Sequence, residues 1–165
     1  MRNLATYSRN PNATTVIAAD SMTLLAAMPG LIARMRPCRL FSLDGGHSPQ
    51  HVLNDLRIAE QVLAPGGVVF VDDMWNPEWP GVTEGMHAYM RTLPSLVPFA
   101  SLGGKLLLTT FSEAHTLFGG RYAQALQQAK RDGKLRGRVF MNNPGRSKHS
   151  QAPSWFGHAL TTVVL

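Results

Sequence analysis

Three apolar runs that each end in aspartate set the pattern of hydrophobic and polar positions along this chain. The runs and the aspartates that follow them are residues 14–19 with Asp20, residues 40–43 with Asp44, and residues 68–71 with Asp72 and Asp73. Each run has the length and composition of a strand, and the segments between them are long enough for a helix. The pattern therefore predicts strand–helix–strand–helix–strand, which builds a parallel sheet.

The position of the aspartates predicts a binding site. In an open parallel sheet, right-handed crossovers bring the carboxyl ends of the strands to one edge, where ligands bind. We therefore expect the aspartates to converge on one acidic crevice. The third run is apolar on both faces, which is typical of a sheet covered by helices on both sides. The expected fold class is α/β.

Helix signals occupy the gaps between the three runs. Ser21 is a favourable N-cap for a first helix, which Pro29-Gly30 is expected to break or kink. Ser48 supplies a second N-cap, and Pro49 is the proline favoured at the first helical position. We expect this second helix to end at residues 64–67.

The second half of the chain carries weaker patterns. Residues 82–93 present one apolar face, which predicts a further helix. Residues 96–110 predict two short strands turned at Gly103-Gly104, a hairpin at one end of the sheet. Residues 112–132 permit a helix, and residues 159–165 predict an edge strand.

The formal net charge of +6 lies at the end of the chain. Residues 1–120 carry a net charge of −1 and residues 121–165 a net charge of +7. The basic residues beyond 121 include Lys130, Arg131, Lys134, Arg136, Arg138, Arg146 and Lys148. We interpret them as a solvated basic tail, with contact to phosphate or an anionic surface as the alternative. They lack the interleaved aromatics of single-strand binders, which argues against nucleic acid.

Length and composition limit the other possibilities. A chain of 165 residues with 44% hydrophobic content can bury one core. It has no run of roughly 20 apolar residues that would predict a membrane span. The single cysteine, Cys38, excludes an intramolecular disulfide and fits a reducing cytoplasm. We expect an extended lead-in over residues 1–13, the α/β domain over 14–132, and a basic segment over 133–165.

Two motifs in the middle of the chain carry a resemblance to a known family. Residues 43–48 read Leu-Asp-Gly-Gly-His-Ser, and residues 64–73 read Ala-Pro-Gly-Gly-Val-Val-Phe-Val-Asp-Asp. Together they resemble the class I S-adenosylmethionine (SAM)-dependent methyltransferases, most of all the bacterial branch of metal-dependent sugar and macrolide O-methyltransferases. Residues 77–82 and 103–106 are similar to its later segments. The resemblance covers about residues 14–125 and implies a Rossmann-like sheet.

The resemblance implies a metal site and a methyl donor. Asp44, Asp72 and Asp73 would hold a divalent cation, Mg²⁺ or Mn²⁺, and hard oxygen ligands suit both ions. His47 matches the general base of some relatives. Asp20, Ser21 and Asp44 would lie at the cofactor, the first two near the adenosine of SAM. The acceptor would be a hydroxyl of a small molecule or sugar.

Simpler interpretations of the same residues stay open. Asp44-Gly45 can form only a tight turn, and Asp72 can be only a cap. His47 can be a residue that leads into the following helix, with no part in catalysis.

The chain departs from the family before residue 14. The family places a glycine-rich turn and a ribose-binding acid there, and residues 1–13 are too few to supply them. We therefore expect the C-terminal part of such an enzyme, lacking the first βαβα portion, with a second chain or N-terminal half completing the site. The alternative is a non-catalytic methyltransferase-like module that binds a partner chain or, through the tail, nucleic acid. A nicotinamide dehydrogenase is a third possibility, but the chain lacks its glycine fingerprint.

Overall fold

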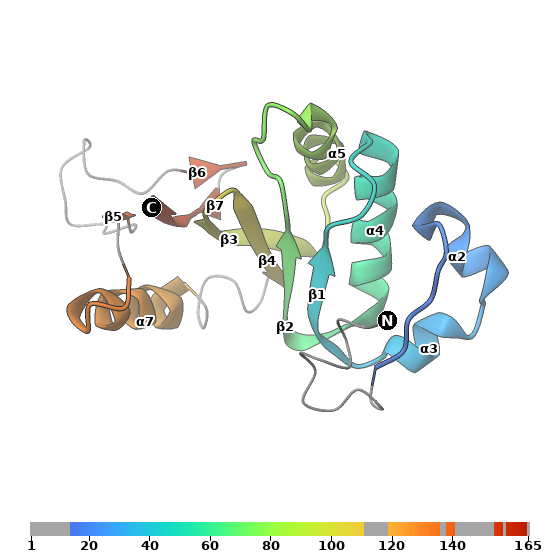
Figure 1. Cartoon of the computed structure of the whole chain (residues 1–165), viewed down its shortest axis with the longest axis horizontal. Helices are drawn as coiled ribbons and strands as arrows, with labels where there is room; N and C mark the ends of the chain where they lie inside the picture. The colour runs from blue at the N-terminus through green and yellow to red at the C-terminus, as the bar shows by residue number, and fades with distance from the viewer. Residues whose placement is uncertain (1–13, 111–118, 136–137, 141–153, 157, 165) are drawn as a thin grey trace.

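A mixed β-sheet with helices on both faces organises the chain (Figure 1). The computed structural model describes residues 14–110, 119–135, 138–140, 154–156 and 158–164. Within them, six strands pair in the order β1-β2-β4-β3-β8-β5. These strands are β1 (Cys38–Leu43), β2 (Leu63–Val71), β3 (Leu96–Leu102), β4 (Lys105–Thr110), β5 (Arg138–Phe140) and β8 (Thr161–Val164).

The remaining described elements are five helices and a small second sheet. The helices are α2 (Ser21–Ala27), α3 (Leu31–Met35), α4 (Pro49–Val62), α5 (Pro80–Met90) and α7 (Gly119–Arg131). The small sheet pairs β6 (Ser154–Trp155) with β7 (His158–Ala159). None of the described helices is long and apolar enough to cross a bilayer.

The pairing of the strands confirms the α/β class. Strands β1 and β2 are parallel, with Leu43 opposite Val71 at their carboxyl ends. Strand β4 is antiparallel to β2, and it forms the predicted hairpin with β3. The hairpin lies inside the sheet, between β2 and β8, and not at one end as predicted, because β8 adds to its outer strand. The hairpin turns at Gly103 and Gly104, both at positive φ, where glycine is favoured. The sheet is therefore Rossmann-like in its parallel β1–β2 pair and mixed as a whole.

The predicted strand over residues 14–19 is wrong. Residues 14–20 form no regular secondary structure, and Val16 is 63% exposed. A run of β-formers becomes a strand only beside a partner strand, and none of the described strands pairs with these residues. Asp20 instead caps α2, because its Oδ1 accepts a hydrogen bond from the Met22 amide at 2.9 Å. Ser21 is thus the first residue of this helix and not its N-cap.

Most of the other sequence predictions hold. Residues Met28–Gly30 separate α2 from α3, and Ser48 caps α4 by accepting from the His51 amide at 3.3 Å. Strand β8 corrects one prediction: it lies between β3 and β5 and is not an edge strand. The division at residue 133 stays a prediction, although strands on both sides of it join the same sheet.

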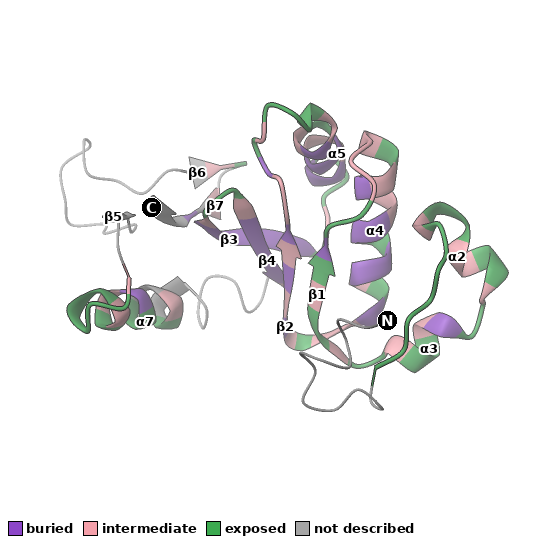
Figure 2. Ribbon diagram, viewed as in Figure 1, coloured by how far each residue is buried: buried purple, intermediate pink, exposed green. Residues whose placement is uncertain are grey.

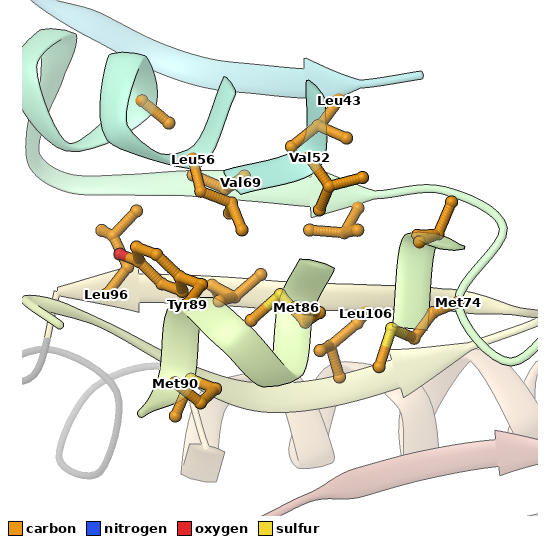
Figure 3. Close-up of a cluster of buried hydrophobic side chains, with 14 of the residues drawn as sticks. Leu43, Val52, Leu56, Val69, Met74, Met86, Tyr89, Met90, Leu96 and Leu106 are labelled. Atoms are coloured by element: carbon orange, nitrogen blue, oxygen red, sulfur yellow. The ribbon is translucent and has the colours of Figure 1, made fainter. Parts of the chain in front are cut away.

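The core lies on both faces of the sheet. On one face, Val69 and Val71 of β2 pack under α4 and α5 with the cluster drawn in Figure 3. On the other face, Val68 and Phe70 pack against a smaller cluster around Phe99, which meets Tyr122 of α7 edge to face. Figure 2 shows β3 and β4 largely buried, whereas β1 and α2 carry exposed positions.

One carboxylate ties α4 to the elements that follow it. Glu60 accepts hydrogen bonds from the Tyr89 hydroxyl at 2.8 Å, the Ser95 amide at 2.9 Å and the Ser95 hydroxyl at 2.8 Å. Burial, together with the Glu60 carboxylate, raises the pKa of Tyr89 well above its usual range. The phenol therefore remains a hydrogen-bond donor inside the core.

The contact between α4 and α5 generates a stability prediction. A Cβ added at Gly85 would lie 2.7 Å from the Pro49 carbonyl oxygen and 2.8 Å from Val52 Cβ. Gly85→Ala should therefore lower the free energy of unfolding, because overpacking costs about 1–3 kcal/mol and the helix-propensity gain is at most about 1 kcal/mol. Urea titration followed by circular dichroism measures the change. Gly30→Ala is the control, since nothing lies within 4 Å of its added Cβ, and an unshifted midpoint for Gly85→Ala would contradict this packing.

Candidate functional site

The candidate site lies where β1 and β2 end. The amide of Asp72, one residue past β2, donates to the carbonyl of Leu43, the last residue of β1, at 3.0 Å and so continues the parallel ladder. Asp44 follows Leu43 directly, so it stands beside Asp72 and Asp73. The ends of two neighbouring strands therefore bring the backbones of these three aspartates together.

Three predicted residues form a close group. Asp44, His47 and Asp73 each offer one ligand atom, and these atoms lie within 4.8 Å of one another. His47 Nε2 is 3.3 Å from Asp73 Oδ2. The other oxygen of Asp73, Oδ1, accepts from the Asn76 side chain at 2.7 Å. We call Asp44, His47 and Asp73 the acidic cluster.

The imidazole of His47 is held between an aromatic ring and a carboxylate. Its ring stacks on Trp79 with centroids 4.3 Å apart and an angle of 26° between the planes. Nε2 is buried and makes no hydrogen bond, while the side chain as a whole is 29% exposed. The exposed part of the ring therefore lies on its other atoms. Gly81 permits this arrangement, because a Cβ there would lie 2.4 Å from the His47 carbonyl oxygen.

Asp72 has a different partner from its neighbour. Its Oδ2 forms an ion pair with Lys105 Nζ, and its Oδ1 accepts from the Asp73 amide at 2.9 Å. The hydrogen bond from Lys105 holds the pKa of Asp72 below its usual range, and the smaller desolvation effect acts in the opposite direction. Asp72 is thus paired with Lys105 and is not part of the acidic cluster. The metal shared by all three aspartates stays a prediction.

The backbone conformation explains why two adjacent aspartates differ. Asp73 has a φ of 53°, in the left-handed region, which aspartate tolerates better than most residues. Strand β2 ends at Val71 and both aspartates belong to the turn that follows it, so the alternation of side chains along a strand does not apply to them. Asp72 contacts Lys105, and Asp73 contacts His47 and Asn76.

A pocket of about 340 Å³ adjoins the acidic cluster at Asp44. Its wall also includes Ser21, the apolar Leu24 and Phe41, and the buried Asp55 of α4. Two of the three residues predicted for the cofactor, Ser21 and Asp44, thus line one pocket. Its volume lies in the range of small-molecule sites.

The third predicted cofactor residue, Asp20, lies apart from this pocket lining. It caps α2, and its Oδ1 is 3.5 Å from His51 Nε2. His51 Nδ1 in turn contacts the Ser48 hydroxyl at 2.7 Å. Asp20 therefore has a structural role at the start of two helices.

A larger groove of about 660 Å³ lies between the loop that follows β2 and helix α5. Trp75 and Asn76 of this loop line it, together with Glu84, His87 and Arg91 of α5. Asn76 also bonds Asp73, so the groove and the acidic cluster share a wall.

Sequence reasoning missed Lys105, Asn76 and Asp55. Lys105 follows the predicted Gly103-Gly104 turn, and the signal that would have found it is the pairing of the hairpin with β2. That pairing places Leu106 opposite Val71. Asn76 carries no motif, and Asp55 has the sequence setting of a solvated helix residue.

Comparison with known proteins supports a methyltransferase family for the first part of the chain. Residues 1–74 match a family model described as a methyltransferase domain. The match ends just after the Asp72-Asp73 pair, so it includes the acidic cluster and the residues named above for the smaller pocket. No curated protein matches the chain.

The Lys105–Asp72 pair generates a prediction about titration. Because the pKa of Asp72 is lowered, its carboxyl should titrate below pH 3.8, its usual value, in carbon-detected NMR. The pair stabilises the fold above the unfolded-state pKa, and this contribution is lost as the pH falls through the folded-state pKa. Lys105→Met should move the Asp72 titration to higher pH. An unshifted Asp72 titration in that variant would show that Lys105 does not contact Asp72 in solution.

Proposed function

We propose that the chain is the catalytic part of a SAM-dependent, cation-assisted O-methyltransferase that acts on a hydroxyl of a small molecule or sugar. The methyltransferase match over residues 1–74 supports the reaction class. The observation that carries the proposal is that Asp44 takes part in two features of the site. This residue belongs both to the acidic cluster and to the wall of the smaller pocket, so a donor in the pocket and an acceptor at the cluster would be neighbours.

The acidic cluster fits a divalent cation. Two carboxylates face a buried imidazole nitrogen that makes no hydrogen bond, and hard carboxylate oxygens suit Mg²⁺ and Mn²⁺. Asp44 and Asp73 would hold the cation, with water and the acceptor completing its ligands. When bound, such a cation acts as a Lewis acid that lowers the pKa of an acceptor hydroxyl.

His47 is the proposed general base. Imidazole is the side-chain group most often used to take a proton from a reacting hydroxyl. The exposed part of the ring is available to the acceptor, while Asp73 Oδ2 lies 3.3 Å from the buried Nε2. The stacked Trp79 would hold the ring in place. The deprotonated acceptor oxygen would attack the methyl carbon of the sulfonium donor, and S-adenosylhomocysteine would leave with the electron pair of the broken S–C bond.

The smaller pocket fits the nucleoside part of SAM. Leu24 and Phe41 offer apolar contacts for a base, whereas the hydroxyl of Ser21 and the carboxylates of Asp44 and Asp55 offer polar partners. SAM supplies the methyl group when bound. The larger groove beside Asn76 is the proposed place of the acceptor, since its aromatic wall and its polar side chains suit an uncharged hydroxylated molecule.

The free edge of β1 supports the proposed completion of the site by a second chain or an N-terminal half. Among the described strands, β1 pairs only with β2, and Leu40 on β1 is 63% exposed. An unpaired edge offers backbone donors and acceptors to a further strand. Such a strand would lie close to the pocket, because Phe41 of β1 lines it.

The proposal predicts weak cofactor binding by this chain alone. The glycine-rich turn and the ribose-binding acid of the family would come from the completing segment. Isothermal titration of the chain with SAM should therefore give a Kd above about 10 μM, which corresponds to roughly −7 kcal/mol. Tighter binding would show that the described residues hold the cofactor without further strands.

His47→Ala tests the chemical step in the completed enzyme. Loss of a general base should lower kcat by about 10²–10⁴-fold, with the affinities for SAM and Mn²⁺ nearly unchanged. The readout is transfer of a labelled methyl group to a panel of hydroxylated acceptors.

The matched control is His51→Ala, a second histidine of the same region that lies outside the acidic cluster. It should keep kcat. A loss of Mn²⁺ affinity in His47→Ala would instead make His47 a cation ligand. Bound SAM without any methyl transfer by the wild type would favour the non-catalytic module.

A further inference from the structure

Lys105 lies opposite Asp72 because of the sheet register. In the antiparallel ladder of β2 and β4, Leu106 pairs with Val71. One step further along both strands, Lys105 stands across from Asp72. Lys105 Nζ forms an ion pair with Asp72 Oδ2. The contact is therefore fixed by backbone pairing and does not depend on a long loop.

This ion pair leaves Asp72 with both oxygens engaged. Oδ2 contacts Lys105, and Oδ1 accepts from the Asp73 amide at 2.9 Å. A cation that took Asp72 as a ligand would come close to the Lys105 ammonium, and the two positive charges would repel each other. The ammonium and the cation thus compete for the same carboxylate.

The sum of the charges around the acidic cluster indicates a role for the Lys105–Asp72 ion pair. Asp44, Asp72 and Asp73 together carry three negative charges when ionised, and Lys105 returns one positive charge. With a neutral His47, the remaining charge of −2 matches one divalent cation. Without Lys105, a third carboxylate would be free to bind, and each additional anionic ligand strengthens the hold on a hard cation.

We propose that Lys105 is a built-in counter-cation that withholds Asp72 from the cation site and so sets its affinity for divalent ions. The inference rests on the cation site of the proposed function. It makes Lys105 a specificity-determining residue, because the ion is held by Asp44 and Asp73 while Asp72 stays paired. A cation held by two carboxylates has more coordination positions left for water and for an acceptor oxygen than a cation held by three carboxylates.

Lys105→Met is the informative variant. The Lys105 side chain is 43% exposed, so its replacement tests the charge more than the packing. The expected result is Mn²⁺ binding tighter by about tenfold or more, about 1.4 kcal/mol or more, measured by isothermal titration and by electron paramagnetic resonance of free Mn²⁺. Both measurements use the full chain without SAM or acceptor, so they are independent of methyl transfer.

Three further variants isolate the pair. Lys105→Met combined with Asp72→Asn has the same net charge as the wild type and should return to the wild-type Kd within about threefold. Lys105→Arg keeps the positive charge and should also bind as the wild type does. Lys134→Met is the matched control, since Lys134 pairs with Asp132 after α7.

The proposal is overturned if Lys105→Met binds Mn²⁺ no more tightly than the wild type and Lys134→Met. It is overturned equally if the double variant keeps the full gain, because the gain would then not come from Asp72. Absence of Mn²⁺ binding in every variant would remove the cation site itself. SAM binding and methyl transfer, measured separately, would then still decide the reaction class.

Discussion

The hydrogen bond from the Asp72 amide to the Leu43 carbonyl aligns the ends of β1 and β2, and the site depends on this alignment. It brings Asp44, the first residue after β1, beside the two aspartates that follow β2. Leu43 of β1 and Val69 and Val71 of β2 are buried in the cluster under α4 and α5 (Figure 3), so the register is held by burial as well as by the ladder. A slip of β1 by one residue would turn Leu43 out of the core and would also move Asp44 away from Asp73.

The opposite side of β2 supplies the positive charge. Because β4 pairs there in the antiparallel direction, the first residue of β4 meets the last residues of β2. At the carboxyl end of β2, the parallel strand β1 thus contributes the Asp44 carboxylate and the antiparallel strand β4 contributes the Lys105 ammonium. The left-handed turn at Asp73 then divides the adjacent aspartates between Lys105 on one side and His47 on the other.

Local sequence patterns predicted the elements whose partners are close along the chain. Strands β1 and β2, the capped helix α4 and the hairpin of β3 and β4 follow from apolar periodicity, Ser48-Pro49 and paired glycines. The prediction of a strand over residues 14–19 was wrong because β-propensity does not say whether a neighbouring strand exists. Lys105 was not predictable for a similar reason, since its contact with Asp72 depends on which strand the hairpin joins. The proximity of Asp44, His47 and Asp73 depends only on the parallel pairing of β1 with β2, and the family resemblance also indicated it. Their functional roles remain proposals.

The stacking of His47 on Trp79 has a practical consequence. The centroid of the Trp79 indole ring lies 4.3 Å from that of the His47 imidazole, which belongs to the acidic cluster. Indole emission responds to charge and polarity at such short range. Protonation of the imidazole, or arrival of a cation among the neighbouring carboxylates, would change the light that this ring emits. The chain therefore carries an intrinsic fluorophore at its candidate site, so that events there can be followed by spectroscopy without an added dye.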